Sequence, residues 1–94
     1  MMKVMFYATF REIIGRREVE VHGVKTVREL VDYLAEHYTP EIKKQLIETP
    51  RVGPDKPIDG MVLVNGRNVL HLKGLDTELN EEDVVHIFPP AGGG

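Results

Sequence analysis

Ninety-four residues, of which 41% are hydrophobic and 29% charged, fit one globular domain and argue against a disordered chain. Twelve basic residues stand against fifteen acidic ones, and this net charge of −3 without a long basic run argues against nucleic acid as the main partner. The chain has no cysteine, which excludes disulfides, thiolate metal ligands and a cysteine nucleophile and favours a cytoplasmic location.

The first quarter of the chain predicts two strands joined by one helical turn. Residues 3–9 are rich in β-branched and aromatic side chains, as strands are, and their apolar run is too short to cross a membrane. Residues 10–14 predict a single helical turn that ends at Gly15. Residues 17–22 alternate between charged and apolar side chains, which indicates a half-buried strand paired with the first.

The next segment predicts the main helix. Thr26 followed by Glu29 is a capping box, the usual start of a helix. Pro40 ends the helix, because the residue before a proline is held in extended geometry, and residues 41–48 predict a second short helix. The apolar stripe of the main helix comprises Val27, Leu30, Val31, Leu34, Ala35 and Tyr38.

A proline- and glycine-rich loop over residues 50–60 leads into a predicted hairpin. Residues 61–64 and 67–72 are its two strands. Asn65-Gly66 between them supplies the positive φ angles that a two-residue type I′ turn needs.

The last third completes a sheet. Residues 75–79 predict a short extended piece, residues 80–83 an acidic turn, and residues 84–88 a final strand. Four or five strands then share one main helix, which covers one face of the sheet only, so the fold class is α+β with a β-grasp arrangement and the last strand parallel to the first. We expect this β-grasp domain to span residues 1–90, followed by a flexible glycine-rich tail over residues 91–94.

The first and last strands of the chain carry more apolar side chains than one helix can cover. Because side chains alternate along a strand, the helix can bury only one set. We assign Val4, Phe6, Val85 and Ile87 to the core. The set left on the open face comprises Met5, Tyr7, His86 and Phe88. Such an uncovered cluster predicts a partner surface, unless the 50–60 loop or the second helix folds over it.

The carboxyl end has no side chain larger than a methyl group after Pro90. Pro89-Pro90 would project it from the sheet, and glycine at the end lets a terminal carbonyl enter a narrow active site, since no Cβ obstructs it. The alternative is a frayed terminus. A carboxylate at Gly94 would need activation by adenylation, and the sequence contains no phosphate-binding loop, so another protein would supply ATP chemistry.

Three stretches of the chain resemble the small subunit of molybdopterin synthase, a family of ubiquitin-like sulfur carriers. Residues 3–8 followed by Arg11-Glu12-Ile13-Ile14-Gly15 look like the family's opening strand and turn, and residues 79–84 look like its acidic turn. The ending Phe88-Pro89-Pro90-Ala91-Gly92-Gly93-Gly94 is similar to F-P-P-x-x-G-G at its spacing. The sequence departs from the family at residues 51–60, where its loop is longer.

The resemblance implies a carrier and not an autonomous catalyst. An adenylating enzyme of the ubiquitin-activating type would use ATP to form an acyl-adenylate at Gly94, next to Gly93, and a sulfur donor enzyme would convert it to a thiocarboxylate. The sulfur would then pass to a pterin precursor in the large subunit of the synthase. No bound cofactor or metal, nucleic acid or membrane is implied. The residues expected to bind partners are Met5, Tyr7, His86, Phe88, Pro89, Pro90, Ala91 and Gly92, with Asn68 or Val69 nearest to a further interface position of the family.

Two alternatives stay open. The same chemistry would serve a ubiquitin-like protein modifier, or a sulfur carrier for thiamine or tungsten-pterin synthesis. A β-grasp interaction module with an incidental tail is the other possibility.

Overall fold

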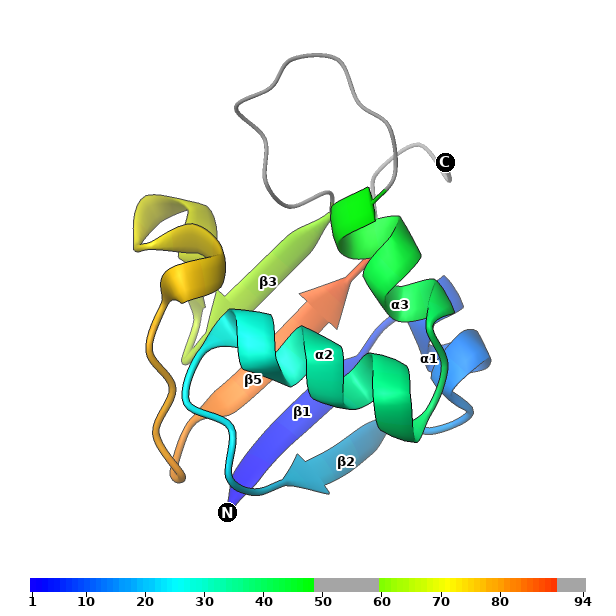
Figure 1. The fold of residues 1–94 in the computed structure, drawn as a ribbon, viewed down its shortest axis with the longest axis horizontal. Coiled ribbons are helices and arrows are strands. Elements are labelled where there is room, and N and C mark those ends of the chain that lie inside the picture. Colours follow the sequence, from blue (N-terminus) through cyan, green and yellow to red (C-terminus); the bar gives the residue numbers. More distant parts are fainter. Residues whose placement is uncertain (49–59, 90–94) are drawn as a thin grey trace.

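The computed structural model describes residues 1–48 and 60–89, and its centre is a mixed five-stranded sheet in the order β2-β1-β5-β3-β4 (Figure 1). β1 and β5 run parallel, and the other neighbouring strands are antiparallel. This α+β arrangement is the β-grasp that the order of elements predicts. The strands are β1 (Met2–Phe6), β2 (Glu18–Val21), β3 (Met61–Val64), β4 (Arg67–Asn68) and β5 (Val84–Phe88).

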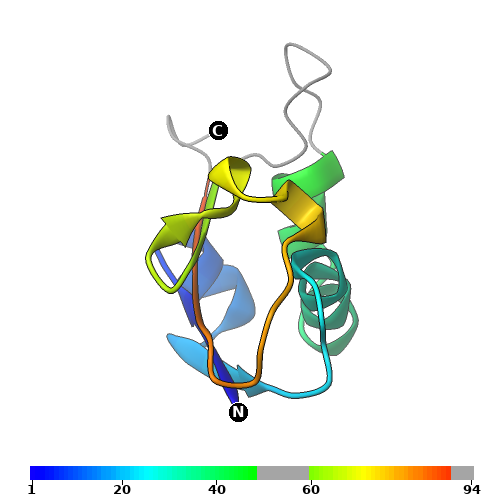
Figure 2. The same cartoon turned by 90° about the vertical axis from the view of Figure 1, so that its left-hand side faces the viewer.

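The helices of the described residues pack on one face of this sheet, and Figure 2 shows the other face uncovered by them. None of these helices is both long and apolar enough to cross a membrane. The helical elements are α1 (Thr9–Ile14), α2 (Val27–His37), α3 (Glu41–Lys43), the π-helical turn η1 (Lys44–Glu48) and the 3₁₀ turns η2 (Val69–His71) and η3 (Gly74–Asp76).

The core lies between α2 and the sheet. The four residues that we assigned to it from strand alternation are all buried: Val4, Phe6, Val85 and Ile87. The predicted stripe of α2 is buried at Val27, Leu30, Val31 and Leu34. Tyr38 was wrongly placed in that stripe. It follows the helix with non-helical backbone angles and is 37% exposed, because α2 ends one residue before it.

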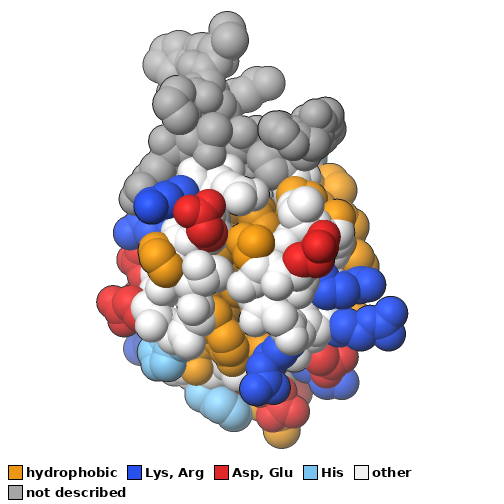
Figure 3. All heavy atoms as spheres, turned by 90° about the vertical axis from the view of Figure 1, so that its right-hand side faces the viewer, with side chains coloured by type: hydrophobic (Ala, Val, Ile, Leu, Met, Phe, Trp, Pro, Cys, Tyr) orange, Lys and Arg blue, Asp and Glu red, His pale blue; other side chains and the backbone are white. Residues whose placement is uncertain are grey.

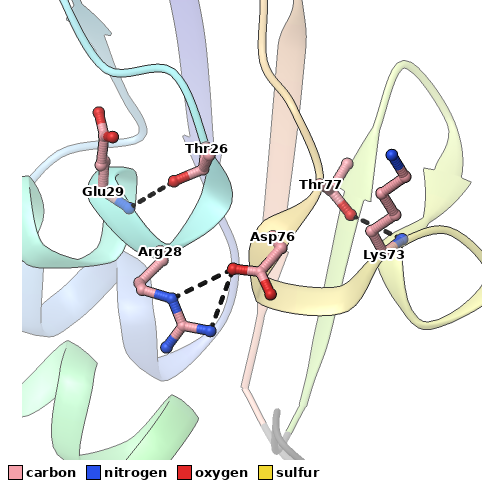
Figure 4. A network of polar contacts seen from close by, with 6 residues as sticks. All are labelled: Thr26, Arg28, Glu29, Lys73, Asp76 and Thr77. Carbon is pink, nitrogen blue, oxygen red and sulfur yellow. Dashed lines mark hydrogen bonds and ion pairs between the residues drawn. The ribbon is translucent and has the colours of Figure 1, made fainter.

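The predicted capping box fixes the start of α2. Thr26 Oγ1 accepts the backbone N–H of Glu29 at 3.2 Å, and the Glu29 carboxylate accepts the backbone N–H of Lys25 at 3.0 Å. Figure 4 shows the ion pair next to it, in which the Arg28 guanidinium lies 3.2 Å from the Asp76 carboxylate. This pair joins the first turn of α2 to η3, although its exposure to water keeps its contribution small.

The structure corrects the sequence prediction in two places after the hairpin. The turn at Asn65 (φ 52°) and Gly66 (φ 85°) is of the predicted kind, but β4 stops at Asn68 and is not a strand to residue 72. The reason is local: Asn68 Oδ1 accepts the backbone N–H of Leu70 at 2.9 Å and starts η2.

Residues 75–79 are likewise not continuously extended. The turn η3 occupies their start, and Glu78 makes only an isolated bridge with Thr26. Thr77 Oγ1 accepts the backbone N–H of Lys73 at 3.1 Å, which closes η3 beside α2 (Figure 4). The predicted loop over residues 50–60 falls almost wholly on residues 49–59, outside the described residues.

Candidate functional site

The open face of the sheet carries a continuous group of apolar and aromatic side chains on three adjacent strands. We call it the open-face cluster. It comprises Met5, Tyr7, Met61, Leu63, His86 and Phe88, each of which is half-buried. The cluster includes all four residues that strand alternation placed on this face.

Strand register makes the cluster continuous. In the sheet, Met5 of β1 lies opposite His86 of β5, and Leu63 of β3 lies opposite the same histidine from the other side. Met61 lies opposite Phe88 in the same way. Side chains that are opposite each other on paired strands point to the same face, so β5 forms the middle of the cluster.

Tyr7 holds the aromatic end of the cluster together. Its ring stacks on Phe88 with centroids 4.3 Å apart and an interplanar angle of 9°. Its hydroxyl is hydrogen-bonded to His86 Nδ1 at 2.7 Å. The guanidinium carbon of Arg11 lies 5.8 Å from the centre of the Tyr7 ring, and Arg11 Nε donates to the carbonyl of Phe6 at 3.3 Å.

Charged side chains border the cluster. On β2, Glu18 lies opposite Met5 and Glu20 lies opposite Lys3, and all three charged groups are exposed. On the side of the molecule that carries α1, Figure 3 shows basic side chains beside acidic ones rather than a stripe of one sign. An apolar centre with a polar border of mixed sign is typical of a protein-docking surface.

Of the two segments considered as a cover, the second helix does not hide this face. The second helix, α3, packs with its Ile42 in the core, which lies on the opposite side of the sheet. The 50–60 loop, the other candidate, lies largely outside the described residues.

The predicted site residues divide into three groups. Met5, Tyr7, His86 and Phe88 lie together on the open face, and Pro89 follows them half-buried. The predicted Pro90, Ala91, Gly92, Gly93 and Gly94 lie outside the described residues. Val69 is fully buried and therefore cannot contact a partner, which corrects that alternative, whereas Asn68 lies opposite Leu63 and is half-buried.

Two members of the open-face cluster were missed from the sequence. Met61 and Leu63 alternate with the buried Val62 and Val64, a signal that was present in the predicted hairpin. The sequence did not show that β3 pairs with β5, and without that neighbour the side chains of β3 had no assigned place on the open face.

The chemistry of the cluster is that of binding. Its groups are aliphatic, aromatic or imidazole side chains that can bury apolar area against a partner. Among residues 1–48 and 60–89, no three histidine, aspartate or glutamate side chains lie together as a metal site would need.

Comparison with known proteins places the chain among small carriers and modifiers. Over 99% of its length it is 37% identical to small archaeal modifier protein 3 of Haloferax volcanii, of which it covers 98%. A solved Pyrococcus furiosus protein, assigned as subunit 1 of molybdopterin converting factor, is 32% identical with a TM-score of 0.66, and 96% of this chain and 97% of that one are covered.

A chain in the crystal structure of the Amycolatopsis orientalis BexX/CysO complex has the same fold. It is 26% identical with a TM-score of 0.78, and both chains are covered completely. Residues 4–94 match the ThiS family, which is nearly the whole sequence and includes all of β2, β3, β4 and β5. The chain therefore belongs to the ThiS family and is a ubiquitin-like protein of the sulfur-carrier and modifier kind.

Proposed function

We propose that this protein is the sulfur carrier of molybdopterin synthesis and that Gly94 is its reacting residue. The Gly94 carboxylate attacks the α-phosphate of ATP on an adenylating enzyme, which forms an acyl-adenylate and releases pyrophosphate. Sulfide-level sulfur from a sulfur donor enzyme then attacks the acyl carbon, forms the C–S bond and displaces AMP, which leaves a thiocarboxylate. The synthase large subunit binds the loaded carrier in the cytoplasm and transfers the sulfur to the pterin precursor.

One observation carries this proposal: the open-face cluster ends at the residue where the reacting segment begins. Phe88 is the last residue of β5 and also stacks on Tyr7. Six residues separate Phe88 from the end at Gly94, a reach of about 20 Å when extended. A partner that docks on the open face therefore has its active site within reach of the glycines.

The partners follow from the same geometry. The adenylating enzyme and the synthase large subunit each need the terminal glycines in an active site, so each would dock on the open-face cluster. The two enzymes would then exclude each other, and the carrier would pass between them by dissociation. The similarity to a chain of the BexX/CysO complex and to a protein assigned as subunit 1 of molybdopterin converting factor supports such partnerships.

Protein modification is the second candidate. The similarity to small archaeal modifier protein 3 favours it, because that relative is similar over almost the whole chain. Activation of Gly94 would be the same, but a lysine amine of a target protein would take the place of the sulfur donor and form an isopeptide bond.

The test has one arm that is common to both candidates and one that separates them. ATP–pyrophosphate exchange by the adenylating enzyme of the same organism should require Gly94 and should be lost in Gly93→Val, while the folded domain is unchanged. Normal exchange with Gly93→Val would contradict both. Intact-mass measurement after purification without thiols should find one oxygen replaced by sulfur for a carrier.

Denaturing gels of cell extracts then distinguish the two candidates. A single band of the free chain supports the carrier, whereas a ladder that disappears in Gly93→Val supports the modifier. A form that ends at Pro90 and still supports cofactor assembly in cells would refute the proposed role of Gly94.

A further inference from the structure

Three side chains from separate parts of the fold form a layered stack at the end of β5. The Arg11 guanidinium of α1 lies over one face of Tyr7, 5.8 Å from the ring centre, while Phe88 stacks on the Tyr7 ring at 4.3 Å. The same guanidinium is also held by a hydrogen bond, because its Nε donates to the carbonyl of Phe6, the last residue of β1, at 3.3 Å. The Tyr7 hydroxyl is fixed by His86 at 2.7 Å. Tyr7 is therefore restrained at its ring and at its hydroxyl.

The backbone next to Tyr7 is held in an unfavourable conformation. Ala8 has φ 52° and ψ −129°, a region that residues with a Cβ rarely adopt. The turn is closed by two hydrogen bonds, from Phe10 N–H to the Tyr7 carbonyl at 3.1 Å and from Arg11 N–H to the Ala8 carbonyl at 3.0 Å. It reverses the chain directly after Tyr7 and returns Arg11 to the Tyr7 ring. Strain of this kind persists where the surroundings fix it, often at functional positions.

The stack lies where the pairing between β1 and β5 ends, so it can hold the end of β5. Among the described residues, the last backbone hydrogen bond between this part of the chain and β5 runs from the N–H of Tyr7, the residue after β1, to the Ile87 carbonyl at 3.2 Å. Pro89 has no N–H and cannot extend the ladder beyond Phe88. β3 still pairs with Phe88 through Met61, but on the other side, past Ile87, the Phe88 ring is the group that Tyr7 contacts at the end of β5.

We infer that Arg11 and Tyr7 are positioning residues: they clamp Phe88 and so fix the point and direction from which the chain leaves the sheet toward its reacting end. This inference rests on the proposed function of Gly94, and it assigns to Arg11 a task other than contact with a partner. A fixed starting point matters because misplacement of a reacting group by about 1 Å can cost as much as a hundredfold in rate.

The clamp is tested first without any partner. Backbone ¹⁵N heteronuclear NOE values of the full chain are measured at the Phe88 amide, with Val85 as the internal reference. Tyr7→Leu and Arg11→Met should lower the Phe88 value and remove the ring-current shifts of the Phe88 ring protons. Tyr7→Phe should keep the ring-current shifts, since it retains the stacked ring and loses only the hydrogen bond to His86. Arg16→Met is the matched control, because Arg16 is exposed and lies outside the stack.

The second arm is ATP–pyrophosphate exchange with the purified adenylating enzyme of the same organism. A clamp predicts that Arg11→Met lowers kcat about tenfold and leaves KM within about twofold, because docking is retained and placement is lost. Arg16→Met should match the original protein in both. The Arg11→Met chain must first show a dispersed amide spectrum, and Tyr7→Phe serves as the milder variant of the same stack.

Two results would overturn the clamp: an unchanged Phe88 NOE value in both Arg11→Met and Tyr7→Leu, or a raised KM at unchanged kcat, which marks Arg11 as a partner contact. The two failures are distinguishable. If the original protein gives no exchange, the proposed function fails, and the NOE values alone decide whether the clamp exists.

Discussion

Removal of the Asp83 carboxylate should destabilise the fold more than any other single change in the acidic turn. Asp83 is only 8% exposed, and its two oxygens accept separate hydrogen bonds, from Asn65 Nδ2 and from the backbone N–H of Asn80, each at 2.8 Å. Asn65 in turn accepts the backbone N–H of Val84 at 2.9 Å. The carboxylate thus ties the hairpin turn between β3 and β4 to the start of β5.

The expected loss in Asp83→Ala follows from these two bonds. A hydrogen bond to a charged group contributes about 1.5–3 kcal/mol. Asn65 and Asn80 are both exposed, so water can hydrate either donor in the variant and the lower end of that range applies to each bond. The sum is a loss of about 3 kcal/mol in the free energy of unfolding. For a domain of this length, that lowers the Tm by about 15 °C.

Urea and thermal unfolding followed by circular dichroism measure this loss. Glu82→Ala is the matched control. Glu82 is the exposed residue next to Asp83, and its side chain forms no hydrogen bond or ion pair with the other described residues. Its loss should change the free energy of unfolding by less than about 0.5 kcal/mol. Asp83→Asn should fall between the two, since its amide group would face one of the two donors. A loss below about 1 kcal/mol in Asp83→Ala would refute the reasoning.

Two further substitutions test the strained turn and the open face. Ala8→Gly should raise the free energy of unfolding by about 1 kcal/mol, because relief of strain outweighs the entropy that glycine loses on folding. The same change at Ala35 within α2 should lower the free energy of unfolding by about 1 kcal/mol. If urea unfolding shows a loss of stability in both variants, Ala8 is not strained. Leu63→Asp should weaken binding of the adenylating enzyme at least tenfold in isothermal titration calorimetry, as loss of a central apolar contact does. Leu70→Asp is its control at an exposed leucine outside the open-face cluster, and equal weakening by both would argue against docking on that face.

Sequence alternation was sufficient to predict the two faces of β1 and β5. A strand has a period of two, so once Val4 and Phe6 are assigned to the core, Met5 and Tyr7 must point the other way. The capping box of α2 and the Asn65-Gly66 turn were also predictable, because each depends on residues within four positions of one another.

What the sequence did not predict depends on longer-range pairing or on competition for hydrogen bonds. Met61 and Leu63 joined the open-face cluster only because β3 lies beside β5, and strand order is not a local property. The short β4 reflects the Asn68 side chain, which competes with the ladder for a backbone N–H and converts the strand to η2. The ring stack of Tyr7 on Phe88 likewise joins residues from opposite ends of the chain.

The position of β5 in the sheet places the open-face cluster next to the segment that leads to Gly94. Because β5 lies between β1 and β3, its outward side chains His86 and Phe88 have apolar neighbours on both sides. An edge strand would have offered them neighbours on one side only, with unpaired backbone groups on the other. The same strand ends at Phe88, directly before the segment that leads to Gly94. On the function proposed for Gly94, a partner that buries the open face therefore also contacts the residue from which that segment starts, the same residue on which the Tyr7 ring stacks.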